Sequence, residues 1–191
     1  PEVIFRDDKF ESNTLASPEV FIQAGYKVTG SASFSGSYHP WKIFDGKYDH
    51  ATGQDGWYSR NQANNYNPHF TGSINLGTAS GGTATVNGEY VTLKMPEKIC
   101  LKKYVIHGPN KERELPQDWV IYASNDGTTW TSIDIQGGQR IGSGYLDASG
   151  TAVGKTKVYD ITNTTYYDHY AMVVTKAGTD YYFGLQGLEL F

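Results

Sequence analysis

The 191-residue chain contains 16 Lys and Arg against 20 Asp and Glu, a formal net charge of −4 at pH 7, which excludes the broad positive field used by non-specific binders of nucleic acid or anionic membranes. Aromatic residues make up 14% of the chain and charged residues only 19%, a composition opposite to that of disordered chains. The length suits one domain of ~100–200 residues, and no apolar run reaches the ~18 residues of a membrane-spanning helix.

Short segments of alternating or wholly apolar residues, separated by Gly, Asn, Asp and Pro, predict β-strands along most of the chain. The segment 89–95 places Val91, Leu93 and Met95 on one face, and Pro96 is expected to end it. No apolar pattern of helical period lasts three turns. Further strands are predicted at 99–107, 119–123, 130–133, 157–161, 170–175 and 187–191, with a tight turn at Asn125-Asp126-Gly127.

These strand lengths and connections predict an all-β fold, an antiparallel β-sandwich. The first 25 residues differ in composition from the rest and are expected to be a lead-in segment or an extra strand, with residues 26–191 forming the domain. The four tryptophans belong to predicted strands or strand edges, and large aromatics mostly serve burial. We therefore assign Trp41, Trp57, Trp119 and Trp130 to the core.

Motifs of catalysis are missing from the sequence. It contains no Gly-x-Ser-x-Gly, His-Glu-x-x-His, phosphate loop or dinucleotide glycine fingerprint. The five histidines are scattered and no pair has metal-ligand spacing. We expect no enzyme activity and predict no catalytic residues.

Four blocks of sequence, in order, then point to a family. They are Ser31-Ala32-Ser33 with Pro40–Gly46 (PWKIFDG), Gly88–Leu93 (GEYVTL), Trp119–Trp130 (WVIYASNDGTTW), and Tyr170–Val174 with the terminal Gly187–Phe191. Together they resemble the F5/8 type C (discoidin-like) family, including the galactose-binding modules of carbohydrate-binding family 32. The resemblance implies that the sandwich is a jelly roll.

The resemblance also implies a structural Ca²⁺ at the turn that follows the first block. Ca²⁺ takes six to eight oxygens and mixes carboxylates with carbonyls. The stretch from Asp45 to Trp57 is longer than is usual in the family, so Thr52 or Asp55 is expected to supply a displaced ligand. The alternative is an ordinary Asx turn without an ion. The ligands implied are the carbonyls of Lys42, Lys47 and Leu188, the carboxylates of Asp45 and Glu189, and Thr52.

Three loops carry residues of the kinds that sugar binders of the family use, namely a His, an Arg with an Asn, and an aromatic face. In the alternative reading the tyrosines pack onto the sandwich and the charged loop is merely solvated. In the last loop Tyr181 and Phe183 should point together and Tyr182 oppositely, because neighbours on an extended segment alternate. The expected sugar contacts are Tyr38, His39, Asn110, Arg113, Tyr181, Tyr182 and Phe183.

The resemblance thus implies a non-catalytic carbohydrate-binding module for glycan recognition or adhesion, with a galactose-type or other cell-surface sugar as its partner. We expect it to be part of a larger extracellular, cell-surface or virion or phage surface protein that gains avidity from several copies. Nucleic acid and membranes are not expected partners. Two alternatives stay open: a discoidin domain that inserts loop-tip aromatics into phospholipid, and a ligand-free structural module of a fibre or enzyme.

Overall fold

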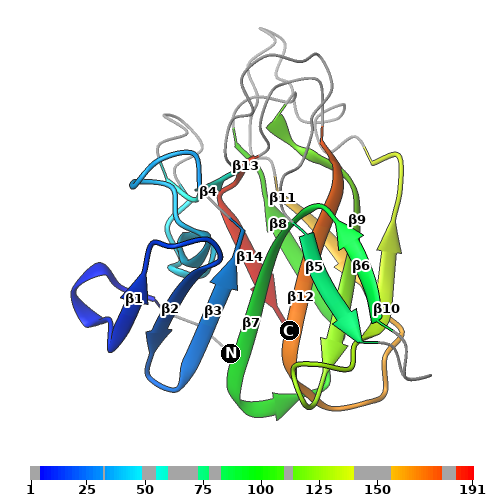
Figure 1. Cartoon of the computed structure of the whole chain (residues 1–191). Helices are drawn as coiled ribbons and strands as arrows, with labels where there is room; N and C mark the ends of the chain where they lie inside the picture. Colours follow the sequence, from blue (N-terminus) through cyan, green and yellow to red (C-terminus); the bar gives the residue numbers. More distant parts are fainter. Residues whose placement is uncertain are drawn as a thin grey trace, which may run out of the picture.

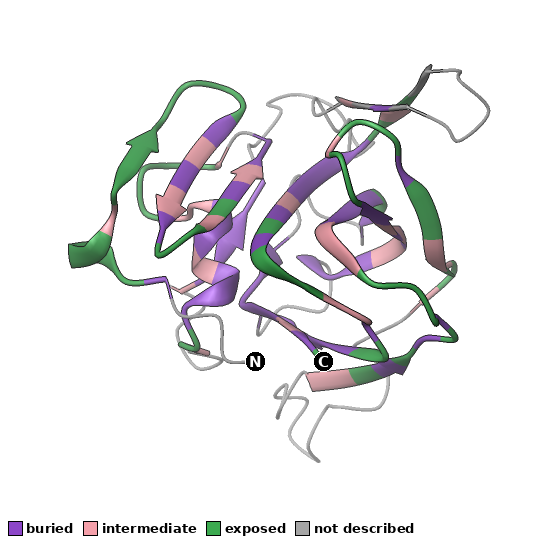
Figure 2. Ribbon diagram, turned by 90° about the horizontal axis from the view of Figure 1, so that it is seen from below, coloured by how far each residue is buried: buried purple, intermediate pink, exposed green. Residues whose placement is uncertain are grey.

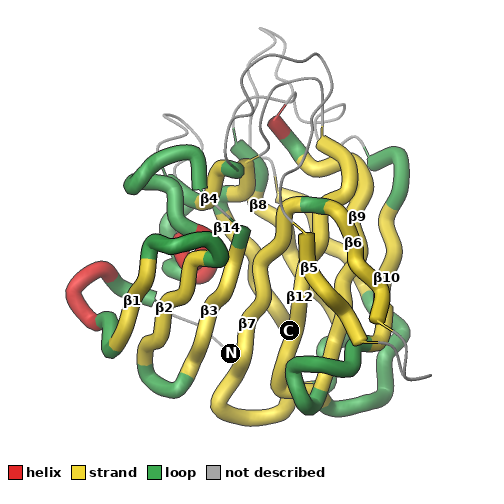
Figure 3. The backbone as a smooth tube through the Cα atoms, in the orientation of Figure 1, coloured by secondary structure: helices red, strands yellow, loops and turns green. Residues whose placement is uncertain are grey.

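Two antiparallel β-sheets, of seven and three strands, pack face to face and confirm the predicted sandwich, and two two-stranded sheets accompany them in the described residues (Figure 1). The computed structural model describes residues 5–31, 33–48, 55–59, 73–77, 83–109, 114–139, 156–177 and 184–191. Strands dominate these residues, and the helical turns η1 (Asp7–Lys9) and η2 (Pro40–Phe44) are 3₁₀ (Figure 3).

The larger sheet has seven strands in the order β1-β2-β3-β7-β12-β9-β10, and all of its pairs are antiparallel. The facing sheet has the order β11-β8-β14, and β13 pairs with β4 beside it. The large sheet comprises β1 (Ser12–Thr14), β2 (Glu19–Gln23), β3 (Tyr26–Gly30), β7 (Glu89–Ile99), β12 (Tyr167–Ala177), β9 (Pro116–Ser124) and β10 (Thr131–Gln136). The others are β11 (Thr156–Asp160), β8 (Lys103–His107), β14 (Gly187–Leu190), β13 (Gly184–Leu185), β4 (Trp57–Tyr58), β5 (Ser73–Gly77) and β6 (Thr83–Asn87).

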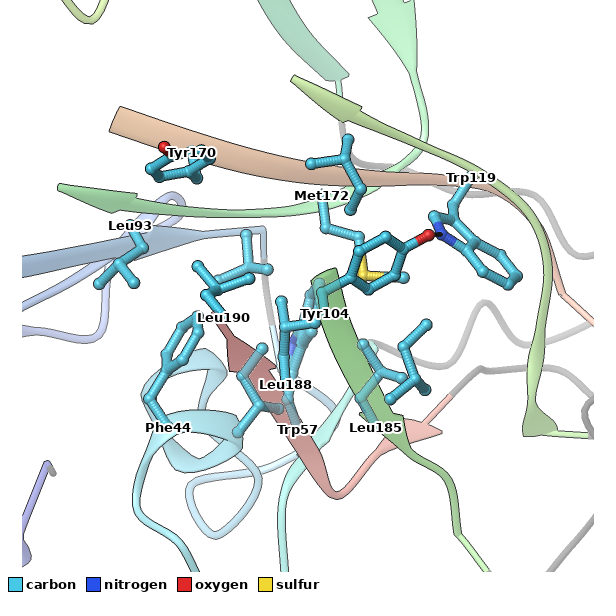
Figure 4. Packing of buried hydrophobic residues seen from close by; sticks show 14 of the residues in the cluster. Phe44, Trp57, Leu93, Tyr104, Trp119, Tyr170, Met172, Leu185, Leu188 and Leu190 are labelled. Carbon is cyan, nitrogen blue, oxygen red and sulfur yellow. Dashed lines mark hydrogen bonds between the residues drawn. The ribbon is translucent and has the colours of Figure 1, made fainter. Parts of the chain in front are cut away.

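The main core lies between the inner faces of the two sheets. Tyr170 and Met172 of β12 face Leu188 and Leu190 of β14, with Phe44 of η2 closing one side (Figure 4). Seen from below, buried stretches line the interior and exposed stretches lie at the periphery (Figure 2). The alternation predicted for 89–95 is confirmed. All four tryptophans are buried as expected, with exposed fractions of 2% for Trp41, 0% for Trp57, 1% for Trp119 and 8% for Trp130.

A polar tie connects the two sheets inside this core. The indole Nε1 of Trp119 on β9 donates to the hydroxyl of Tyr104 on β8 at 2.9 Å. That hydroxyl donates in turn to Oδ2 of Asp134 on β10 at 2.6 Å. Burial raises the pKa of Tyr104, so the phenol keeps its proton and acts as a donor. The tie satisfies buried polar groups that would otherwise cost stability.

A second, smaller core lies on the outer face of the large sheet. The hairpin β5–β6 lies over β12 and β9 (Figure 1). Leu76 of the hairpin packs with Trp130 and Ala171. Ala171 alternates with its neighbours Tyr170 and Met172, which face the main core, so this cluster belongs to the opposite face.

Two predicted boundaries are wrong. Pro96 does not end its strand, because β7 continues to Ile99. The β7–β12 register shifts between Lys94 and Ile99, and a proline is tolerated where ladder hydrogen bonds are interrupted. The strand predicted at 99–107 begins only at Lys103, since residue 99 still belongs to β7.

The beginning of the chain packs against the sandwich. Strands β1 and β2 extend the large sheet beyond β3. Phe5 and Phe21 are each 1% exposed and belong to the main core. Residues 5–25 therefore contribute both a sheet edge and apolar packing.

Candidate functional site

The loop between β3 and η2 is closed by a tight contact at its base. A Cβ on Gly30 would lie 2.5 Å from Cγ of Pro40, so only glycine lets the end of β3 approach the start of η2. The intervening residues 33–39 form a short excursion that carries two of the expected sugar contacts, Tyr38 and His39.

A buried carboxylate from β2 organises this loop. Oε1 of Glu19 accepts hydrogen bonds from the backbone N–H of Ser33 at 3.2 Å and from its hydroxyl at 2.5 Å. Oε2 lies 2.9 Å from Nδ1 of His39. The side chains of His39 and Glu19 are 12% and 9% exposed. His39 is therefore an anchor of the loop through Nδ1, a role that the sequence did not predict.

The same three residues do not form a nucleophilic relay. Such a relay needs the hydroxyl and the carboxylate on different nitrogens of the imidazole. Here the Ser33 hydroxyl donates to Glu19, and both groups approach the same Nδ1 of His39. The arrangement fits a structural clamp.

Three aromatic rings, those of Phe34, Tyr38 and Tyr58, lie in sequence beside one another at this loop. The rings of Phe34 and Tyr38 lie 6.1 Å apart, and Tyr38 meets Tyr58 of β4 edge-on at 5.0 Å. The backbone N–H of Phe34 donates to the carbonyl of Tyr58 at 2.8 Å. Phe34 keeps 45% of its surface exposed, whereas Tyr58 is 6% exposed.

The turn after η2 holds an unusual carboxylate. The N–H of Lys47 donates to Oδ1 of Asp45 at 2.8 Å, but the buried Oδ2 has no hydrogen-bond partner. Burial, with a smaller contribution from the charge of Asp55, raises the pKa of Asp45 to about 6. Nζ of Lys42 lies 3.8 Å from Oδ1 of Asp55. Asp45 thus presents a desolvated oxygen that a cation, a proton or a hydrogen-bond donor would satisfy.

Glu189 has a different partner from the one expected. Its Oε1 lies 2.5 Å from Nε2 of His107. Nδ1 of the same imidazole lies 3.0 Å from the hydroxyl of Thr156. The ring of Tyr48 stacks on His107 at 3.8 Å and fits over the bare Cα of Gly187. The chain that follows Asp45 therefore crosses the edge strand β14.

The residues expected to bind Ca²⁺ are only partly assembled. The turn with Lys42, Asp45 and Lys47 lies against β14, whose Leu188 side chain is in the core. Thr52 lies outside the described residues. Within the described ranges no three His, Cys, Asp or Glu side chains converge on one point. Asp45, with its unpartnered oxygen, fits a hard cation, whereas the Glu189 carboxylate is engaged by His107.

The expected sugar contacts are also divided. Tyr38 and His39 lie on one loop, while five others are outside the part of the chain that the structure describes: Asn110, Arg113, Tyr181, Tyr182 and Phe183. Sequence reasoning missed Glu19 and Phe34. Phe34 carried a signal, since it is a lone aromatic among Ser33, Ser35, Gly36 and Ser37. Glu19 carried none, because its contacts are 14 and 20 residues away.

The fold of this chain is similar to those of solved carbohydrate-binding modules. A family 32 carbohydrate-binding module of a family 31 glycoside hydrolase from Clostridium perfringens is 13% identical, with a TM-score of 0.56 over 98% of this chain and 99% of that one. The chain has the discoidin-like fold of family 32 modules. No family model matches the sequence, and no curated protein matches it either.

Two further modules with this fold were solved with sugars. The family 32 module of C. perfringens NanJ, in complex with galactose, is 8% identical with a TM-score of 0.54 over 87% of this chain and 93% of that one. A C. perfringens module named CpGH89CBM32-5, in complex with GalNAc-β-1,3-galactose, is 17% identical with a TM-score of 0.51 over 87% and 95%. In the described part of this chain, no helix is long and apolar enough to cross a membrane.

Proposed function

We propose that the chain is a non-catalytic carbohydrate-binding module. The observation that carries the proposal is the match of the fold, over nearly the whole of both chains, to a module of family 32. The loop 33–39 supports it, because it combines an exposed aromatic ring with hydroxyl-bearing residues. Sugar sites need this combination, an apolar face for the ring carbons and polar groups for the hydroxyls.

A glycan array that includes galactose- and GalNAc-β-1,3-galactose-terminated glycans tests this function. We expect selective binding of one class of terminal sugar, and competition by the free sugar in solution. No binding to any glycan, with Ca²⁺ present and with the protein shown to be folded, would favour the structural-module alternative. Because a shallow site binds weakly, the protein should be presented in multivalent form.

We also propose that the Asp45 turn binds Ca²⁺. The unpartnered, buried Oδ2 of Asp45 supports the proposal. Burial raises the pKa of Asp45 to about 6, so its ionised form is desolvated and would be stabilised by a bound cation. Carbonyls of Lys42 and Lys47 and the nearby Asp55 are the other oxygens of this turn. Oε1 of Glu189 is engaged by His107, so Glu189 would join them through its other carboxylate oxygen.

Substitution of Asp45 by Asn separates a cation site from a simple Asx turn. The amide keeps the hydrogen bond from Lys47 and removes the desolvated charge, so without metal D45N should be at least as stable as wild type. Ca²⁺ should raise the melting temperature of the wild type, since an ion bound only by the folded state adds RT ln(1 + [L]/Kd). D45N should lose that gain. Equal Ca²⁺ responses of the two proteins in thermal-shift assays would refute the site.

The setting of the module is part of the same proposal. We place it in a larger protein outside the cell, at a cell surface or on a virion, where several copies would supply avidity for a glycan. Expression with the flanking chain, followed by surface labelling, tests this location.

A further inference from the structure

We propose that Lys27 of β3 and Lys94 of β7 form a site for an oxyanion group, a sulfate ester or a carboxylate, carried by an acidic glycan. This inference rests on the proposed carbohydrate-binding function and names a class of glycan for it. The site lies on the outer face of the large sheet, where β3 and β7 run side by side (Figure 1). It is therefore built on strands, and not on the loops that carry the expected sugar contacts.

The register of the sheet brings two like charges together. Lys27 and Lys94 are direct partners in the β3–β7 ladder. Their neighbours Val28 and Leu93 are 0% and 2% exposed and belong to the main core, so both lysines point to the outer face, where they are exposed. Directly opposite residues have Cβ atoms about 4.5–5.5 Å apart, and like charges there destabilise a sheet. A bound anion would remove this repulsion.

No acidic side chain neutralises the pair within the described residues. Neither ammonium forms an ion pair there. In the same row of the sheet, Lys27 is flanked by the apolar Ile22 and Lys94 by His169. The imidazole of His169 is engaged elsewhere, since its Nδ1 lies 2.7 Å from Oδ1 of Asp168. The two positive charges therefore face solvent without a counter-charge.

The chemistry around the two lysines suits a single anionic group. Thr29 and Thr92 form the next pair of the same ladder and are partly exposed. An ammonium offers three donors and a hydroxyl one, so these two strands can supply several hydrogen bonds to the oxygens of a sulfate or carboxylate. Two charges match one such group, whereas the chain's net charge of −4 opposes nucleic acid and anionic membranes.

Titration with sodium sulfate, followed by NMR of the backbone amides, tests the site without a sugar. We expect saturable shifts in β3 and β7 that sodium chloride at equal ionic strength does not produce. Lys27→Gln and Lys94→Gln should each weaken sulfate binding by about two- to fivefold. Lys176→Gln is the matched control, because Lys176 is exposed on the same sheet but faces Asp118 in the β12–β9 ladder. It should bind sulfate like the wild type.

Stability gives a second readout that needs no ligand. Because K94Q removes one of two opposed charges, it should melt about 1–3 °C above the wild type at low salt. The difference should disappear at high salt, since salt screens exposed charges. A K94Q variant that melts below the wild type at low salt would contradict the repulsion on which the site depends.

A sulfated galactan oligosaccharide and the same oligosaccharide after desulfation test the acidic glycan. The wild type and K176Q should bind the sulfated form about two- to fivefold more tightly, and K27Q and K94Q should lose this preference. Raising sodium chloride from about 20 mM to about 300 mM should reduce it. An oligogalacturonate, which carries carboxylates instead, shows which of the two oxyanions binds better.

The outcomes separate this inference from the function on which it rests. Sulfate shifts that are unchanged in both K27Q and K94Q would mean an adventitious ion only and refute the site, while binding on the glycan array would still support the function. Equal binding of the sulfated and desulfated oligosaccharides by the wild type would overturn the acidic glycan, and so would binding of no glycan at all, which also removes the function. Flotation of the wild type, but not of K94Q, with phosphatidylserine vesicles would overturn the proposal in favour of a membrane contact.

Discussion

At the scale of single residues, Asp126 shows how one side chain defines a turn. Its Oδ1 accepts hydrogen bonds from the N–H groups of Thr128 at 2.7 Å and Thr129 at 2.6 Å, and from the Ser124 hydroxyl at 3.0 Å. These donors hold the pKa of Asp126 well below its ordinary value. Gly127 follows with φ of +69°, a left-handed conformation that glycine adopts without strain.

Asp126→Asn should therefore destabilise the protein in a pH-dependent way. A depressed pKa means that ionised Asp126 stabilises the folded state at every pH above the ordinary Asp pKa of ~3.9, and that this contribution fades as the pH falls below it. The gap in melting temperature between wild type and D126N should be constant from pH 7 to 5 and shrink between pH 4 and 2.5. A gap that is as large at pH 2.5 as at pH 7 would contradict the assignment.

At the scale of elements, the sequence predicted strands whose pattern and turn are local, but not strands whose position depends on packing against distant segments. The hairpin β9–β10 was found because its turn and both strands are adjacent in sequence. For the first 25 residues the sequence predicted only a lead-in segment or an extra strand. They form β1 and β2, whose pairing with each other and with β3 depends on tertiary packing. The hairpin β5–β6 lies in a Gly- and Asn-rich stretch in which we predicted no strand, and its own sequence does not indicate which face of the large sheet it covers.

A Leu→Ala substitution should lower the free energy of unfolding by different amounts in the two hydrophobic cores. Leu76 and Leu93 are each 2% exposed, but Leu76 belongs to the hairpin's small core and Leu93 to the main core. Leu93→Ala should lower the free energy of unfolding by about 2–5 kcal/mol. Leu76→Ala should cost less, because a two-stranded hairpin can detach without unfolding the sandwich.

Hydrogen exchange distinguishes these responses. In L76A, exchange should accelerate in β5 and β6 alone, while urea unfolding of the whole domain changes little. In L93A, protection should fall throughout the large sheet. Uniform loss of protection in L76A would mean that the hairpin and the sandwich unfold as one unit.

At the scale of the whole molecule, the sequence predicted the β-sandwich and drew attention to the turn at Asp45. It did not predict which residues from distant segments contact the predicted site residues. Asp45 was singled out by the family resemblance; its buried Oδ2 has no hydrogen-bond partner, and the Ca²⁺ site stays a prediction. Glu189 was identified in the same way, yet His107 engages it. The clamp on His39 depends on Glu19, 20 residues earlier, on β2 of the large sheet, in the stretch that the sequence analysis separated from residues 26–191. A motif indicates which residue types lie close together in the sequence. The contacts of Glu189 with His107 and of Glu19 with His39 depend instead on the order of strands in the sheets.

The start of the chain offers the sharpest test of how the molecule is held together. A chain that begins at residue 26 would lack Phe5 and Phe21, both 1% exposed, as well as the Glu19 clamp. Loss of a buried Phe side chain costs about 3–5 kcal/mol, and a domain is stable by only about 5–15 kcal/mol.

The shortened chain should also expose the edge of β3 to pairing with other molecules. We therefore expect it to lose its cooperative thermal transition and to elute as aggregates in size-exclusion chromatography, with the full chain as the control. A monomeric 26–191 fragment with an unchanged melting temperature would show that β1 and β2 are only an appendage.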